Sequence, residues 1–125
     1  MTIKHILVVD DSPTERQFLS ELLSRHGYSV STADSAESAF RVARENRPQL
    51  ILMDVVMPGQ NGFQATRELS RDPAFGGVPV IICSSKHQET DRIWGLRQGA
   101  RDYLVKPVDP ELLLQRVAAL SRTSV

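Results

Sequence analysis

Near the middle of the chain lies the run Leu50-Ile51-Leu52-Met53-Asp54, four consecutive apolar side chains that end at a carboxylate. A strand with one solvent-facing side alternates apolar and polar residues, whereas this run has no polar member before Asp54. Residues 6–9 and 80–83 are apolar in the same continuous way. Such runs are typical of the central strands of a parallel sheet that helices cover on both faces.

Outward from this run, five expected strands alternate with five expected helices. Less apolar strand-like runs occupy residues 28–31 and 102–105. Capping residues, apolar spacing and prolines predict helices over approximately residues 13–26, 35–47, 62–72, 89–98 and 110–120. The alternation predicts one α/β domain over residues 1–125, a (βα)5 doubly wound five-stranded parallel sheet.

The first expected helix carries the clearest local signals. Ser12 can cap its N-terminus, Pro13 suits its first turn, and Glu15 is expected to complete a capping box. The apolar spacing predicts one stripe along this helix, made of Phe18, Leu19, Leu22 and Leu23.

The composition disfavours several classes of protein. Fifteen basic residues balance fifteen acidic ones, so no general attraction to nucleic acid or to an anionic membrane is expected. The N-terminus lacks a secretion-signal pattern and no run reaches membrane-spanning length, so we expect a cytoplasmic protein without membrane insertion. The single cysteine, Cys83, lies in an apolar run and is expected to be a buried strand residue rather than a redox site.

Reactive or charged side chains follow four of the five expected strands. They are Asp10 and Asp11 after the first strand, Asp54 after the third, Ser84 after the fourth and Lys106 after the fifth. The carboxyl ends of parallel strands meet at one edge of a doubly wound sheet, where such folds bind ligands. The sequence therefore predicts one functional site at this edge.

Three carboxylates at one edge repel each other unless a cation lies among them. We expect a hard divalent cation, Mg²⁺ or Mn²⁺, held by Asp11, Asp54 and a backbone carbonyl that follows Asp54, with Asp10 acting through water. Beside that cation an ionised Asp54 is a carboxylate nucleophile for a phosphoryl group. Lys106 would supply positive charge and Ser84 a hydroxyl donor to the phosphoryl oxygens.

Four motifs occur together: Asp10-Asp11-Ser12, then Asp54 followed by Met57-Pro58-Gly59 and Gly62, then Ser84, and then Lys106-Pro107. This combination resembles the two-component receiver domains typified by the chemotaxis regulator CheY, over about residues 5–120. The resemblance implies a flavodoxin/CheY-like sheet with the strand order 2-1-3-4-5. Segments 61–67, 88–91 and 94–103 are further similar to the stand-alone receivers that control type IV pilus twitching motility.

The resemblance also implies roles for individual residues. Asp54 would accept a phosphoryl group from a chemotaxis-type sensor histidine kinase, which makes the chain a signalling protein rather than an enzyme. The metal-binding carbonyl would be that of Val56, and the Lys106-Pro107 peptide bond would be cis. On phosphorylation Ser84 would move toward the phosphoryl group and Tyr103 would turn inward. A downstream protein would then bind the face made by the fourth helix, fifth strand and fifth helix.

Three further residues have roles that the sequence leaves open. Val56 and Lys86 occupy the positions that tune phosphoryl loss in the receiver family, and their combination leaves the lifetime of the acyl phosphate undetermined. Trp94, in the fourth expected helix, is either a core residue or, as we prefer, part of a partner-binding patch.

Other interpretations also stay open. Asp10 and Asp11 can cap the first helix, and Lys106 can be an ordinary surface lysine. A phosphatase of the haloacid dehalogenase type needs an Asp-x-Asp pair after the first strand, which this chain lacks. A flavodoxin-like cofactor binder has a Ser/Thr-rich loop where this chain has two carboxylates. A receiver can also act as a phosphate sink that competes for a shared kinase.

Overall fold

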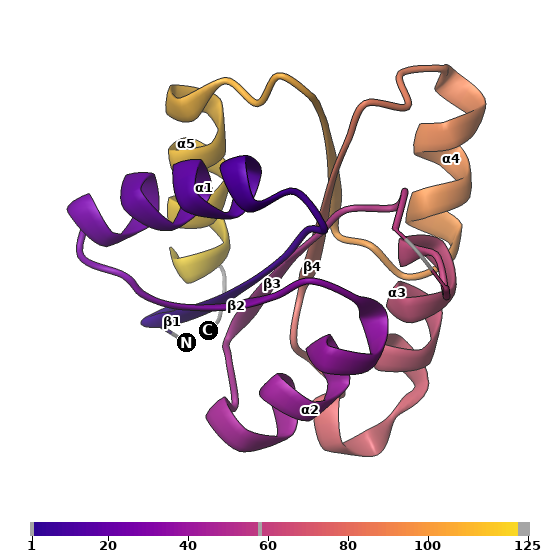
Figure 1. Ribbon diagram of the computed structural model, residues 1–125, viewed down its shortest axis with the longest axis horizontal. Coiled ribbons are helices and arrows are strands. Elements are labelled where there is room, and N and C mark those ends of the chain that lie inside the picture. The colour runs from indigo at the N-terminus through magenta and orange to yellow at the C-terminus, as the bar shows by residue number, and fades with distance from the viewer. Residues whose placement is uncertain (1, 58, 123–125) are drawn as a thin grey trace.

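The computed structural model describes residues 2–57 and 59–122, and its strands form one parallel sheet in the order β2-β1-β3-β4-β5 (Figure 1). The strands are β1 (His5–Val9), β2 (Ser29–Ala33), β3 (Leu50–Met53), β4 (Val80–Ser84) and β5 (Asp102–Val105). The helices are α1 (Pro13–Arg25), α2 (Ala36–Asn46), α3 (Gly62–Arg71), α4 (Glu89–Arg97) and α5 (Pro110–Arg122), with a short 3-10 helix, η1 (Pro73–Phe75), after α3. The predicted fold class and strand order are confirmed.

Helices cover both faces of the sheet, which explains the continuous apolar runs. Alternate side chains of β1 point to opposite faces. Ile6 and Val8 join the apolar cluster that includes residues of α1 and α5, whereas Leu7 and Val9 join the cluster that includes residues of α2 and α3. Figure 1 shows the same division, with α1 and α5 on one side of the sheet and α2, α3 and α4 on the other. Polar side chains of the central strands are therefore confined to the strand ends.

Two local predictions at α1 are wrong. The Ser12 hydroxyl accepts the Glu15 N–H (3.3 Å) as expected, but the Ser12 N–H donates to Asp10 Oδ1 (3.0 Å) instead of entering a capping box with the Glu15 side chain. Phe18 is 38% exposed, so the buried stripe consists of Leu19, Leu22 and Leu23 alone. Phe18 precedes Leu19 by one residue and therefore lies about 100° around the helix from it.

The environment of the single cysteine and the length of the helices also bear on the expectations from the sequence. Cys83 is buried in β4, as predicted, and its burial raises the pKa of the thiol to about 12, so the thiol stays protonated at neutral pH. Within the described ranges, no helix combines the length and the apolar character that a bilayer crossing requires. Pro58, which belongs to one of the predicted motifs, lies outside the described residues.

Candidate functional site

The predicted site residues meet at the carboxyl edge of the sheet. Asp10 and Asp11 directly follow β1, Asp54 follows β3, Ser84 ends β4 and Lys106 follows β5. Main-chain hydrogen bonds continue past the strand ends, because the Asp54 N–H donates to the Val9 carbonyl (2.9 Å) and the Lys106 N–H donates to the Ser84 carbonyl (2.8 Å). The sheet thus fixes the relative positions of all four strand ends.

Three carboxylates form the acidic part of the site. One oxygen from each of Asp10, Asp11 and Asp54 lies within 4.8 Å of the other two, and Asp10 and Asp54 are buried while Asp11 is exposed. Burial first, and the charge of Asp10 second, raise the pKa of Asp54 to about 6, although the charge of Lys106 opposes this rise. A hard divalent cation fits this donor set, since it binds carboxylate oxygens and would reduce the repulsion between Asp10 and Asp54.

Lys106 points into the site rather than into solvent. Its ammonium donates to Asp10 Oδ2 (2.6 Å) and lies 3.8 Å from Asp54 Oδ1. Burial lowers the pKa of Lys106, but the hydrogen bond to Asp10 and the charge of Asp54 together raise it above its ordinary value. The interpretation of Lys106 as a surface lysine is therefore wrong, and the Lys106-Pro107 peptide bond is cis as expected.

Asp10 has a structural contact as well as its place in the acidic cluster. Its Oδ1 accepts the N–H of Ser12, the residue that caps α1, so Asp10 orients the cap residue and the interpretation of Asp10 as the helix cap is wrong. Its backbone carbonyl accepts a hydrogen bond from Arg16 Nη1 (2.8 Å), a contact that the sequence did not predict. Arg16 stands one turn into α1 and has no motif of its own, so no pattern of residue types indicated it.

The segment after Asp54 is partly open to solvent. The Asp54 side chain accepts a long hydrogen bond from the Val56 N–H (3.5 Å), and the Val56 side chain is 54% exposed. The Gly62 N–H donates to the Val55 carbonyl (3.1 Å), which brings the start of α3 against the backbone of Asp54. A Cβ at Gly62 would overlap the carbonyl oxygen of Asp54, so only glycine permits this close approach.

The backbone of Lys86 links the two predicted switch residues. The Ser84 hydroxyl, which is fully buried, accepts the Lys86 N–H (3.1 Å). The Tyr103 hydroxyl donates to the Lys86 carbonyl (2.8 Å), and the ring is only 7% exposed. Sequence reasoning assigned Lys86 a role through its side chain, which is exposed; the contribution of its backbone carries no sequence signal.

Gly95 makes room for the inward ring of Tyr103. A Cβ at Gly95 would lie 3.0 Å from Tyr103 Cδ2 and 2.9 Å from Ile82 Cδ1. Neighbouring Trp94 is 50% exposed, so it does not fill the core, and it lies on α4 with Ile93, which is 40% exposed. The sequence indicated Trp94 but gave no reason to expect a role for Gly95.

In the metal-free protein, replacing Asp54 with asparagine is expected to stabilise the fold increasingly as the pH rises. The unfolded carboxyl ionises near its ordinary pKa of 3.8 and the folded one near 6, so the folded state retains the proton between these values. The wild type consequently loses stability relative to Asp54→Asn as the pH rises from 4 to 7, by on the order of 2–3 kcal/mol. Urea unfolding at pH 4 and pH 7 in the presence of a chelator measures this difference. The control is Glu45→Gln, which replaces an exposed carboxylate. If Asp54→Asn raised the free energy of unfolding equally at both pH values, the raised pKa of Asp54 would be contradicted.

The chain is similar to known proteins in both sequence and structure. The sequence profile of the response regulator receiver domain matches residues 6–118. The chain is 53% identical over 115 residues to Protein PilH of Pseudomonas aeruginosa, covering 92% of this chain and 95% of that protein. It is 41% identical over 117 residues to the response regulator PleD of Caulobacter vibrioides, covering 94% of this chain but spanning only 26% of that longer protein. The structure of the chemotaxis protein CheY4 of Vibrio cholerae matches with a TM-score of 0.88 at 30% identity, covering 95% of this chain and 99% of that one.

Proposed function

The chain belongs to the response regulator receiver domain family, and on that premise we propose that Asp54 accepts a phosphoryl group from a sensor histidine kinase of the chemotaxis type. The observation that carries the proposal is the position of the buried Asp54 carboxylate, between two further carboxylates and 3.8 Å from the Lys106 ammonium. Outside the cluster of Asp10, Asp11 and Asp54, no carboxylate among the described residues lies in such an acidic group with a lysine beside it, and within the cluster Asp10 is the one whose Oδ2 accepts the Lys106 hydrogen bond (2.6 Å). We further propose that residues 1–125 act as one receiver domain in the cytoplasm.

The transfer is a substitution at phosphorus. An oxygen of ionised Asp54 forms the new bond to phosphorus while the bond from phosphorus to the kinase histidine nitrogen breaks, and the electron pair of that bond remains on the imidazole. A Mg²⁺ ion, held by Asp11, Asp54 and the Val56 carbonyl with Asp10 acting through water, would neutralise charge on the phosphoryl oxygens. Lys106, whose ammonium lies 3.8 Å from Asp54 Oδ1, would supply a second positive charge, and the Ser84 hydroxyl would donate a hydrogen bond to a phosphoryl oxygen.

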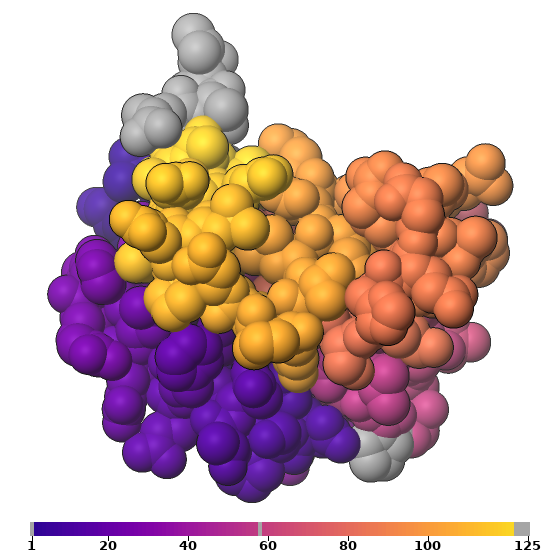
Figure 2. Space-filling view, turned by 90° about the horizontal axis from the view of Figure 1, so that it is seen from above, coloured from indigo at the N-terminus to yellow at the C-terminus, as the bar shows by residue number. Residues whose placement is uncertain are grey.

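The signal would leave through the surface of α4, β5 and α5. Figure 2 shows these segments as a continuous band, from α5 in yellow through the paler orange of the β5 region to α4 in deeper orange. Ile93, Trp94 and Val105 are exposed apolar side chains on α4 and β5, and exposed aromatic side chains are frequent anchors of protein interfaces. The Tyr103 hydroxyl connects this surface to Ser84 through the backbone of Lys86.

The similarity to Protein PilH supports a finer assignment. That relative matches over 95% of its own length, which favours a receiver that acts through protein contacts. We infer that the physiological process is the control of type IV pilus twitching motility. The side chains of Val56 and Lys86, both exposed beside the site, would set the lifetime of the acyl phosphate.

Incubation with acetyl phosphate, with and without Mg²⁺, tests the proposed function. Intact-mass measurement should show one added phosphoryl group on the wild type with Mg²⁺, and none on Asp54→Asn. An adduct that persists in a chelator, or on Asp54→Asn, would contradict the mechanism. Turnover of a phosphomonoester would support the haloacid dehalogenase interpretation instead.

Replacing Gly95 with alanine is expected to displace the Tyr103 ring and to destabilise the fold by about 1 kcal/mol, because the added methyl group contacts Tyr103 and Ile82 at close range. NMR of the Tyr103 ring protons and thermal unfolding measure the two effects. Tyr103→Phe is the matched control, since it loses the hydrogen bond to Lys86 but keeps the ring. Unchanged ring shifts in Gly95→Ala would show that the space beside Gly95 does not control the ring.

A further inference from the structure

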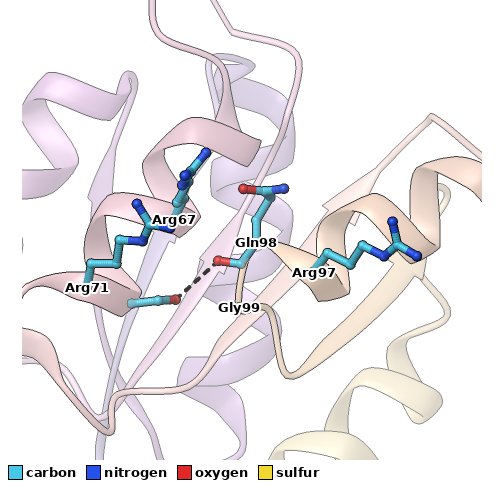
Figure 3. A pocket seen from close by; sticks show the side chains of 6 residues that line it. Arg67, Arg71, Arg97, Gln98 and Gly99 are labelled. Carbon is cyan, nitrogen blue, oxygen red and sulfur yellow. Dashed lines mark hydrogen bonds between the residues drawn. The ribbon is translucent and has the colours of Figure 1, made fainter.

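A basic groove lies between α3 and the end of α4. It has a volume of about 390 Å³ and is lined by Arg67, Ser70, Arg71, Arg97, Gln98 and Gly99. Figure 3 shows the side chains of Arg67 and Arg71 next to each other on α3, with Gln98 beside them and Arg97 extending along α4. The Ser70 hydroxyl lies within hydrogen-bond distance of the Gln98 carbonyl (3.4 Å), which joins the two helices at this groove.

Among the described residues, the arginines of the groove have no acidic partner. The ion pairs of residues 2–57 and 59–122 involve Arg92, Lys106 and Arg116, and none involves Arg67, Arg71 or Arg97. The two acidic residues nearest in sequence have other contacts. Glu68 accepts a hydrogen bond from Gln60 Nε2 (2.8 Å), and Asp72 accepts one from the Ala74 N–H (2.9 Å) at the start of η1.

Interaction with the helix dipoles accounts for only some of the positive side chains in the groove. Arg71 lies in the last turn of α3 and Arg97 in the last turn of α4, where positive side chains interact favourably with the helix dipole. Arg67 lies a full turn earlier and gains little from the dipole. It also repels Arg71, since like charges four residues apart on a helix are destabilising. A ligand that carries negative charge would remove this repulsion.

We propose that the groove binds an acidic segment of a partner protein, with carboxylates placed on Arg67 and Arg71. Arginine presents a planar fork that binds a carboxylate through two hydrogen bonds. The residues that line the groove include no aromatic side chain on which a nucleobase could stack. Glu68 lines the adjoining cavity, so a nucleic-acid backbone that extended into it would meet a negative charge. A polypeptide can cover an open groove and exclude water, which strengthens each charge pair.

The test is fluorescence anisotropy at low salt with a fluorescein-labelled hexaglutamate peptide. The double variant Arg67→Gln, Arg71→Gln is expected to bind the peptide at least tenfold more weakly than the wild type. The matched control, Arg41→Gln with Arg44→Gln, removes the same charge from exposed positions of α2 and is expected to change the affinity less than twofold. Both double variants are expected to be phosphorylated by acetyl phosphate like the wild type, which separates this result from the function of Asp54.

NMR mapping on the wild type provides an independent measurement, even if the double variant does not fold. Peptide addition is expected to shift the amide signals of residues 67–71 and 97–99. Equal loss of affinity in the two double variants, shifts spread over the whole surface, or no binding to the wild type would overturn the proposal. Tighter binding of a single-stranded oligonucleotide or of inorganic phosphate than of the peptide would also overturn it.

Discussion

Replacing Lys106 with methionine is expected to slow the phosphorylation of Asp54 on the order of 100-fold at saturating Mg²⁺. The ammonium lies 3.8 Å from Asp54 Oδ1 and the lysine side chain is only 16% exposed, so a cation from solvent is not expected to take its place. Methionine keeps most of the length and apolar character of the lysine side chain, and the variant therefore removes chiefly the charge. The rate of adduct formation with acetyl phosphate, followed by intact mass, measures the effect.

Lys4→Met is the matched control, because Lys4 is exposed and lies at the opposite edge of the sheet. Its phosphorylation rate should equal that of the wild type. Lys106→Met should also show a higher pKa for Asp54 in the absence of metal, since the lysine charge lowers that pKa. If Lys106→Met reacted at the rate of the wild type, Lys106 would be only a structural partner of Asp10.

Replacing Gly62 with alanine is expected to lower the free energy of unfolding by about 3 kcal/mol and the Tm by roughly 10 °C. The added Cβ would overlap the Asp54 carbonyl oxygen and would crowd the Cα of Val55, and both of these are backbone atoms that a side-chain rotation cannot move away. The start of α3 must therefore shift away from Asp54. Thermal unfolding followed by circular dichroism measures the loss.

Gly76→Ala is the control for this substitution. Gly76 has a φ of −58°, and a Cβ there would come no closer than 3.7 Å to another atom outside its chain neighbours. Its Tm should stay within a few degrees of the wild type, because an alanine at a compatible glycine changes stability by less than about 1 kcal/mol. Equal melting temperatures for Gly62→Ala and the wild type would mean that α3 can withdraw without cost.

The sequence was sufficient to predict that Asp10, Asp54, Ser84 and Lys106 lie at the same edge of the sheet. Parallel strands that are buried on both faces all end at one edge, so the position of a residue directly after a strand determines where it lies. The same reasoning places Asp11 with Asp54, because Asp11 comes only two residues after the end of β1. These predictions depended on topology, which continuous apolar runs signal strongly.

The contacts that the sequence did not predict depend on the conformation of loops and of the main chain. The Lys106 ammonium lies 2.6 Å from Asp10 Oδ2 and 3.8 Å from Asp54 Oδ1, and no pattern of residue types predicts a difference this small. The link from Ser84 to Tyr103 uses the N–H and carbonyl of Lys86, groups that every residue except proline possesses. The capping box failed at Ser12 because a neighbouring carboxylate, Asp10, competed for the same N–H group.

The ion pair between Lys106 and Asp10 joins residues 96 positions apart in the chain. During synthesis a ribosome releases the strands that carry the acidic residues well before it releases the lysine, and domains fold as units once their parts are available. A nascent chain that ends before β5 lacks the lysine that offsets its buried carboxylates. Under the proposed function, phospho-acceptor competence should therefore arise only after β5 and Lys106 have been released.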